Sequence, residues 1–271
     1  MRVAIVVSGL VRFPEQGFHF LKKILNYSVH DVDIYAGLWD TDSIPDNISR
    51  ELKSIAMIPC SLKDELQKLI LDNNILIKGN VTNFIESHLG LISHMATCSE
   101  FSKDLLQYDA VIKWRWDLAV LYDHFDLFCA LHNWSKNTLT TDDLIVQAGS
   151  LHMNEVVFIS DPELMIKSFT PVRERFLALA SMLDLKLLMH GDNFKISTFD
   201  SHASLVSSVY GNIKISQILW ALLRKNILDN LHLLDTNEVH KLIKLQKDYD
   251  LVLTKEKMKK QQEQDLQNLN K

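Results

Sequence analysis

Short runs of apolar, β-branched residues alternate with longer segments of helical periodicity along the first half of this chain. The runs span residues 2–7, 32–38, 54–58 and the stretch around Val111 and Ile112, and the helical segments span about 15–26, 62–71 and 81–107. A continuous apolar run is typical of a parallel strand that is buried on both faces. The alternation therefore predicts an α/β protein with a mostly parallel sheet and helices on both faces.

The composition fits a chain that buries a large core. Of the 271 residues, 47% are hydrophobic and 23% are charged, and the formal net charge is −5. An acidic balance disfavours nucleic acid as the main partner. No apolar run approaches the roughly 20 residues of a membrane-spanning helix, and the run at residues 3–7 is too short for a signal peptide.

The cysteines point to a reducing compartment. Cys60, Cys98 and Cys129 are scattered and form no C-x-x-C pair. This usage is typical of proteins that carry no disulfide framework, and it disfavours a cysteine-based zinc site. We therefore expect a cytoplasmic protein without a transmembrane segment.

The second half of the chain gives weaker signals. Residues 118–121 are predicted to continue the strand of Val111, residues 144–146 and 213–215 to form short strands, and residues 201–210 and 217–225 to form helices. Residues 154–163 predict a strand, a turn and a helix start, with Asp161 as the N-cap and Pro162 at the first helical position. That helix is expected to run to about residue 183, with an interruption near Pro171.

The C-terminal stretch differs from the rest in composition. Residues 240–271 are rich in lysine and glutamine and poor in aromatic residues. Such a segment is typical of a solvated helix or a flexible tail. We predict one globular domain over residues 1–239, followed by a tail over 240–271 that frays or serves an oligomer contact.

The first predicted strand ends in a loop that can approach a ligand. The loop has the sequence Ser8-Gly9-Leu10-Val11-Arg12-Phe13-Pro14. A glycine lets the backbone come close to a bound group, and an arginine can hold a phosphate through two hydrogen bonds. The loop lacks both the lysine-terminated phosphate-binding pattern and G-x-G-x-x-G. An ordinary strand-to-helix turn is the alternative interpretation.

Residues 108–118 place an arginine and a carboxylate at the end of a buried strand. Arg115 and Asp117 are two residues apart, and alternate residues of a strand share a face, so these two side chains point together. The flanking Trp114 and Trp116 point the other way, where they fit the core. At the carboxyl end of a strand in an open α/β sheet, such a charged pair can face a charged ligand or a metal ion. A structural ion pair that closes the strand is the alternative.

Together these motifs resemble a family of bacterial and viral glycosyltransferases. The resemblance rests on the opening strand with Ser8-Gly9 and Arg12, on Asp33-Ile34-Tyr35 before Trp39, on a helix serine (Ser87 or Ser93), and on Tyr108-Asp109-Ala110-Val111-Ile112-Lys113-Trp114-Arg115-Trp116-Asp117-Leu118. A later strand preceded by Glu155 and a helix with Glu163-Leu164-Met165 extend it over about residues 2–225. It implies a GT-A-like, Rossmann-like fold and a glycosyltransferase that moves a sugar from a nucleotide-diphosphate donor to a glycan or related hydroxyl acceptor, as in polysaccharide biosynthesis.

The resemblance and the chemistry of the residues imply a donor site and a catalytic base. The expected donor-binding residues are Ser8, Gly9, Arg12, Arg115 and Asp117. Asp117, with His190 as a second ligand, is expected to hold Mn²⁺ or Mg²⁺ against the donor phosphates, although arginines can neutralise the same charge. Glu155 and Asp192 are the candidate bases for the acceptor hydroxyl.

Two features depart from the family pattern. Arg115-Trp116-Asp117 carries one carboxylate where such enzymes often carry Asp-x-Asp, and Glu155 stands where the family usually has aspartate. A literal Asp-x-Asp at Asp40 and Asp42 is better explained by a turn. The resemblance therefore leaves metal dependence open.

Two other functions fit the same residues. One is a sugar nucleotidyltransferase or phosphotransferase with a similar sheet, and the other is a non-catalytic glycan-binding or scaffold domain. A fold alone does not choose among them, because function resides in the site. The donor sugar, the acceptor, the linkage, the stereochemical outcome and the oligomeric state are not encoded in these patterns.

Overall fold

The structure is a computed structural model of the chain. It describes the backbone of residues 1–26, 30–77, 79–120, 138–141, 144–147, 150–153, 158–190, 212–215 and 220–222. Side chains are described for residues 1–26, 30–77, 79–118 and 159–181. Within these ranges, no helix combines the length and the apolarity that crossing a bilayer requires.

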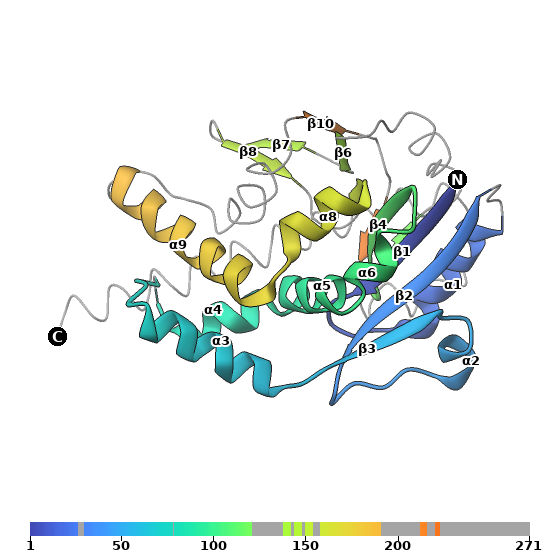
Figure 1. The fold of residues 1–271 in the computed structure, drawn as a ribbon, viewed down its shortest axis with the longest axis horizontal. Coiled ribbons are helices and arrows are strands. Elements are labelled where there is room, and N and C mark those ends of the chain that lie inside the picture. Colours follow the sequence, from blue (N-terminus) through green and yellow to red (C-terminus); the bar gives the residue numbers. More distant parts are fainter. Residues whose placement is uncertain are drawn as a thin grey trace.

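A seven-stranded, mostly parallel sheet forms the centre of the molecule (Figure 1). The strands are β1 (Arg2–Ser8), β2 (Asp31–Trp39), β3 (Ser54–Ile58), β4 (Ala110–Arg115), β6 (Thr138–Thr141), β9 (Phe158–Ser160) and β10 (Asn212–Ile215), in the spatial order β10-β6-β9-β4-β1-β2-β3. Strands β4, β1, β2 and β3 run parallel, β9 runs antiparallel to both its neighbours, and β10 is parallel to β6. The predicted α/β class and its mostly parallel sheet are confirmed.

Two short antiparallel pairs lie outside this sheet. β7 (Leu144–Gln147) pairs with β8 (Ser150–Met153), in agreement with the strand predicted over residues 144–146, and β5 (Leu118–Val120) pairs with β11 (Trp220–Leu222). The second of these pairs corrects two predictions. Residues 116 and 117 form a turn, so residues 118–120 do not continue β4, as the prediction over 118–121 had it. The helix predicted over 217–225 is wrong at β11, because a short apolar run fits a strand or a helix equally well and its pairing partner lies about 100 residues earlier.

One face of the sheet is covered by α1 (Pro14–Leu25) and the short α2 (Asp46–Ser49). In α1 the buried Phe18, Leu21 and Ile24 recur at helical spacing and pack against the odd-numbered residues of β1. Pro14 stands at the first helical position, where its missing N–H has no intrahelical partner to lose. The helix predicted over about residues 15–26 is confirmed.

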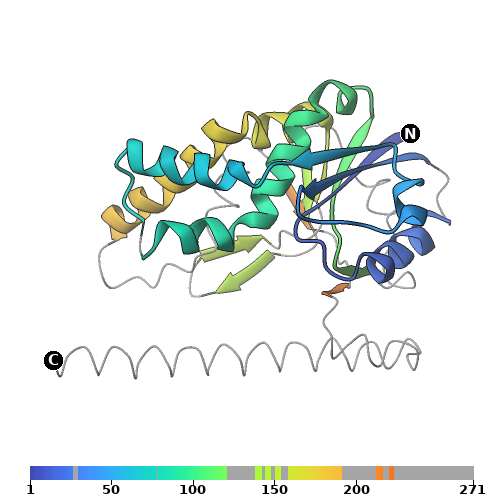
Figure 2. The same ribbon diagram turned by 90° about the horizontal axis from the view of Figure 1, so that it is seen from below.

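The other face is covered by the remaining helices, as Figure 2 shows. They are α3 (Ser61–Asp72), α4 (Val81–Ser87), α5 (Leu89–Glu100), α6 (Ser102–Leu105), α8 (Pro162–Phe169) and α9 (Val172–His190). α5 lies centrally, in contact with β1, β2 and β3 and with α8 and α9. Most of its side chains are therefore buried.

The single helix predicted over residues 81–107 is wrong, because the structure divides it into α4, α5 and α6. At the first break, the carbonyl of Phe84 accepts hydrogen bonds from Ser87 Oγ and His88 Nδ1, both at 2.7 Å. The N–H of His88 donates to Ile85 instead of Phe84. Side chains that bond to the local backbone compete in this way with helix continuation.

The later helices largely follow the sequence signals. Asp161 caps α8, since its carboxylate accepts a hydrogen bond from the N–H of Leu164 at 3.1 Å, and Pro162 begins the helix as predicted. The predicted interruption is confirmed near Pro171, between α8 and α9. α9 runs to His190 rather than to about residue 183. His190, the predicted second metal ligand, is thus the last residue of α9.

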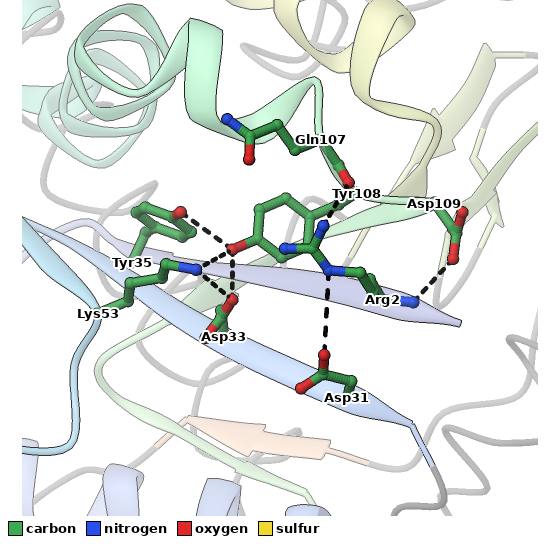
Figure 3. A network of polar contacts seen from close by, with 8 residues as sticks. All are labelled: Arg2, Asp31, Asp33, Tyr35, Lys53, Gln107, Tyr108 and Asp109. Atoms are coloured by element: carbon green, nitrogen blue, oxygen red, sulfur yellow. Dashed lines mark hydrogen bonds and ion pairs between the residues drawn. The ribbon is translucent and has the colours of Figure 1, made fainter.

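A polar network joins β1, β2 and β4 at the amino edge of the sheet (Figure 3). Asp109 accepts a hydrogen bond from the N–H of Arg2 at 2.7 Å, and the Tyr108 hydroxyl donates to Asp33. Lys53 Nζ donates to Asp33 at 2.6 Å and to the Tyr108 hydroxyl at 3.0 Å. Although burial acts to raise it, the pKa of Asp33 is held below its ordinary value by the hydrogen bonds from Lys53 and Tyr108. The Tyr-Asp half of the sequence signature therefore anchors strands.

Removing the Tyr108 hydroxyl should destabilise the fold more than removing that of Tyr35. The Tyr108 oxygen bonds to Asp33, Lys53 and Tyr35, whereas the Tyr35 hydroxyl has the Tyr108 oxygen as its partner at 3.0 Å. We expect Tyr108→Phe to lower the free energy of unfolding by about 1–3 kcal/mol and Tyr35→Phe by less. Urea denaturation of both variants measures this, and equal losses would contradict the assigned network.

Helix α1 requires glycine where it crosses the turn after β4. A Cβ at Gly17 would lie 1.9 Å from the carbonyl oxygen of Trp116, a backbone atom that cannot move aside alone. We expect Gly17→Ala to cost about 1–3 kcal/mol of stability through overpacking. Gly90→Ala in α5 is the matched control, because its Cβ would meet nothing nearer than 4.0 Å, and it should stabilise by about 0.5–1 kcal/mol. Thermal unfolding of both variants measures these effects. An equal change in Tm for the two variants would contradict the assigned packing.

Candidate functional site

The predicted donor-binding residues lie where the strand order of the sheet reverses. From β1 the chain passes through α1 to β2 and β3 on one side, then returns through α5 and enters β4 on the other side of β1. In open α/β sheets, ligands bind outside the carboxyl ends of the strands at such a switch point. The region beyond the carboxyl ends of β1 and β4 is therefore the candidate site.

Strand register brings the two predicted segments together. Ser8 at the end of β1 is the cross-strand partner of Arg115 at the end of β4. Gly9 and Asp117 follow directly in the adjoining turns, and Arg12 lies in the exposed part of the loop before α1. The parallel pairing thus gathers residues that are about 100 positions apart in the sequence.

Arg115 and Asp117 form a two-bond ion pair. Arg115 Nε donates to Asp117 Oδ1 at 2.9 Å and Nη2 donates to Oδ2 at 3.0 Å. The Asp117 side chain is fully buried, while that of Arg115 is 33% exposed. The prediction that the two side chains point together is confirmed, and the alternative of a structural ion pair describes the same geometry. Such paired, charge-assisted hydrogen bonds fix the plane of the guanidinium group.

Both tryptophans of this segment belong to the core, as predicted. Trp114 and Trp116 are each 1% exposed and pack in the cluster that α1 covers. The indole N–H of Trp116 donates to the carbonyl of Gly37 in β2 at 3.3 Å. Stacking of a nucleotide base on either ring is therefore not part of the site.

The β1 end is tied to α5 by two side chains. Ser8 is 1% exposed, and its hydroxyl lies 3.0 Å from His94 Nδ1. The N–H of Gly9, whose φ is 110°, donates to Ser93 Oγ at 3.1 Å. Ser8 thus faces the interior. His94 had no signal in the sequence, whereas Ser93 was one of the two helix serines in the resemblance.

The loop after Gly9 carries an exposed cation. Arg12 is exposed, and Phe13 beside it adopts a left-handed conformation with φ 50° where α1 begins. Non-glycine residues adopt this conformation rarely. Arg115 ends β4, and Arg12 follows the end of β1 in the loop. Two cations after neighbouring strand ends suit an anionic ligand.

The described residues do not form a divalent-cation site. No group of three or more His, Cys, Asp or Glu side chains capable of holding a metal occurs among them. Asp117 supplies one carboxylate, and each of its oxygens already accepts a hydrogen bond from Arg115. The side chain of His190, and Glu155 and Asp192 altogether, lie outside the described residues. Their assigned roles remain predictions.

The literal Asp-x-Asp after β2 makes turn contacts. Asp40 accepts a hydrogen bond from the N–H of Cys60 at 3.1 Å, and the N–H of Asp42 donates to the carbonyl of Trp39 at 2.8 Å. The hydrogen bonds from Cys60 hold the pKa of Asp40 below its ordinary value, whereas burial raises that of Asp42. The turn interpretation is confirmed.

Cavities occur at two other places in the described part of the chain. One of about 440 Å³ is lined by residues of β3, α3, α5 and the start of α9. Another of about 460 Å³ lies beside the end of α1 and the starts of β2 and β3. Neither is lined by a predicted site residue, so the site is assigned from topology and charge rather than from cavity size.

Comparison with known proteins gives distant structural similarities. No protein-family model and no curated protein sequence matches the chain. Mouse xyloside xylosyltransferase 1, in its apo form, is 11% identical with a TM-score of 0.42, over 79% of this chain and 84% of that one. A glycosyltransferase involved in glycosylating the major capsid of PBCV-1 is 8% identical with a TM-score of 0.39, over 80% and 82%. The glycosyltransferase GlyE of Streptococcus pneumoniae TIGR4, also in its apo form, is 16% identical with a TM-score of 0.35, over 78% and 44%. At this distance the functional proposal rests on the chain's own residues.

Breaking the Arg115–Asp117 pair should have unequal consequences. Arg115→Met leaves a fully buried carboxylate without its cation, and we expect a loss of about 3–5 kcal/mol in the free energy of unfolding. Asp117→Asn leaves the guanidinium group of Arg115, which water reaches. This variant should therefore lose less free energy of unfolding than Arg115→Met. The double variant should cost less than the sum, because neither charge is then stranded. Urea denaturation of the two single variants and the double variant measures the interaction free energy between Arg115 and Asp117. Additive losses would show that this interaction free energy is zero.

Proposed function

We propose that this protein is a GT-A-like, nucleotide-sugar-dependent glycosyltransferase that acts on a hydroxyl of a glycan or related acceptor. One observation carries the proposal: the register pairs Ser8 with Arg115, so that the strand end from which the loop of Arg12 starts lies next to the Arg115–Asp117 pair. Two arginines at the carboxyl edge of a parallel sheet suit a diphosphate. Asp117 fixes the guanidinium group of Arg115 in one orientation. An ordinary strand-to-helix turn would not require such a group, and this favours a ligand site.

The chemistry of transfer explains why the arginines matter. As the bond from the sugar to the diphosphate breaks, negative charge grows on the leaving phosphate, and groups already aimed at that charge lower the barrier. Arg115 is fixed in advance by Asp117 and needs no reorganisation. Arg12, on an exposed loop, supplies a second positive charge. In this proposal both contact the donor diphosphate, while the buried Gly9 holds the start of the loop against α5.

The remaining assignments follow from the sequence. Glu155 or Asp192 is proposed as the base that takes the proton of the acceptor hydroxyl. The Mn²⁺ or Mg²⁺ that the sequence predicts on Asp117 and His190 is the alternative to this proposal, because both Asp117 oxygens already accept hydrogen bonds from Arg115. Such a cation, when bound, neutralises donor phosphates. The described residues do not fit one, so charge neutralisation is assigned here to Arg115 and Arg12 alone. A cytoplasmic place in polysaccharide biosynthesis belongs to the same proposal.

The fully buried Asp117 supports one rival. A carboxylate held on both oxygens by arginine can serve structure alone, which suits a non-catalytic glycan-binding or scaffold domain. A sugar nucleotidyltransferase or phosphotransferase is the other rival. The products separate these functions, because a glycosyltransferase releases nucleoside diphosphate and a nucleotidyltransferase releases pyrophosphate.

A donor screen tests the proposal directly. UDP-, GDP- and dTDP-sugars, each with a mixture of glycan acceptors, should reveal one donor whose nucleoside diphosphate is released with acceptor present. We expect Arg115→Lys to lower kcat/KM by about 10²-fold, because lysine cannot reproduce the fixed planar contact. Arg50→Lys, at an exposed arginine beyond α2, is the matched control and should retain activity.

The alternative outcomes of the screen are equally distinct. Release of pyrophosphate in a parallel reaction that contains a nucleoside triphosphate and a sugar 1-phosphate would make the protein a nucleotidyltransferase. Absence of both turnover and thermal stabilisation with every donor would favour the scaffold.

Metal removal tests whether the arginines or a divalent cation neutralise the charge of the donor phosphates. Because the arginines are assigned the phosphate charge, we expect turnover to persist after dialysis against EDTA. Loss of turnover in EDTA, with recovery in Mn²⁺ or Mg²⁺, would instead support a cation held by Asp117 and His190. The measurement is nucleoside diphosphate release with the donor identified in the screen.

A further inference from the structure

We propose that His94 and Ser93 of α5 are positioning residues of the candidate site, which fix the Ser8-Gly9 end of β1 and thereby place the loop of Arg12 beside Arg115. The inference rests on the proposed function for its kinetic consequence. Its structural half, that these two side chains hold the loop, stands on contacts between described residues.

The contacts come from consecutive residues of one helix. Ser93 Oγ accepts the N–H of Gly9 at 3.1 Å, and His94 Nδ1 lies 3.0 Å from Ser8 Oγ. Ser93 and His94 are fully buried, and Ser8 is 1% exposed. Water therefore does not compete for either bond, and an unmade bond would strand a buried polar group.

The start of the loop packs against the first turn of α5. A Cβ built on Gly9 would lie in ordinary van der Waals contact, 3.9 Å, with the Cα of Gly90. The φ of 110° at Gly9 is a conformation that glycine adopts without strain. The chain thus leaves β1 in a direction set by α5, and the loop to Arg12 starts from a fixed point.

His94 is itself held from two further sides. Its Nε2 lies 3.5 Å from Cys98 Sγ, one turn later in α5, and its ring meets the edge of Phe169 in α8 at a centroid distance of 4.7 Å. The imidazole therefore links α8, α5 and the end of β1. A side chain that only filled space would not need both ring nitrogens.

The protonation states agree with this geometry. Burial, assisted by the positive charge of Lys113, holds the pKa of His94 well below its ordinary value, and burial raises the pKa of Cys98 to about 12. At neutral pH the pair is a neutral imidazole and a thiol. We assign the thiol as donor to Nε2, so that Nδ1–H donates to Ser8 Oγ.

Two substitutions at His94 separate positioning from packing. Asparagine places a polar atom near the former Nδ1 and can keep the bond to Ser8, whereas glutamine places one near Nε2 and can keep the contact with Cys98. Both variants lose the ring and its contact with Phe169. If His94 had a purely structural role, His94→Asn and His94→Gln would change the donor KM and the hydrogen exchange of the loop equally.

The kinetic arm uses the donor identified in the screen. We expect His94→Gln to raise the donor KM about tenfold, the effect of losing one buried hydrogen bond, and His94→Asn to remain within about twofold of the native KM. Equal KM values for the two variants would overturn the positioning role. Total absence of turnover with the native protein would defeat the proposed function, and the second arm still decides the inference.

The second arm needs no ligand. Amide hydrogen exchange of the segment 8–13 should accelerate in His94→Gln and stay near native in His94→Asn, with exchange in β3 and α3 unchanged in both. Ser93→Ala and Ser93→Thr form a second pair if the histidine variants fail to fold. Alanine removes the acceptor for the N–H of Gly9 and should accelerate exchange at residue 9, whereas threonine keeps the oxygen. His94→Gln and Ser93→Ala each remove one hydrogen bond to the Ser8-Gly9 segment. Unchanged hydrogen exchange in both of these variants would overturn the inference.

Discussion

The contact between α5 and the sheet is the constraint on which the rest of the structure depends. α5 crosses the face of β1, β2 and β3, and most of its side chains are buried because α8 and α9 cover its outer surface. The helix comes so close to β2 that a Cβ at Gly37 would lie 1.9 Å from Thr97 Oγ1. Since α5 also returns the chain to the side of β1 where β4 begins, this packing creates the switch point.

The motif of residues 108–118 makes different contacts at the two edges of the sheet. At the amino edge, Tyr108 and Asp109 tie the start of β4 to β1 and β2 through hydrogen bonds. At the carboxyl edge, Arg115 and Asp117 form the charged pair. The apolar residues between them fill the strand, so the spacing of the motif is the length of a buried strand. A motif of this kind anchors one end and presents charge at the other.

Local signals in the sequence were sufficient for the strands of the parallel core and for the Asp161 cap. They failed where a side chain changed the local geometry, as at His88, whose ring bonds to the carbonyl that helix continuation would need. They failed also where pairing is distant, as in β11 with β5. Within the site, Arg115 and Asp117 were accessible to a spacing argument. His94 was not, because its partner Ser8 is 86 residues away and a lone histidine in an apolar helix carries no mark of its contact.

The energetics of the Arg115–Asp117 pair separate its two interpretations. Burying a carboxylate costs several kcal/mol, and apolar residues of similar volume often match or exceed the stability of a buried ion pair. A pair kept for stability alone thus has little advantage over a hydrophobic one. What apolar residues cannot supply is a guanidinium group that is held in one orientation by a fully buried partner and still 33% exposed. Arg115 ends β4 at the switch point, next to Ser8 at the end of β1, and the loop of Arg12 starts there. The cost of burying Asp117 therefore fits the proposal that this charge is prepared for a ligand.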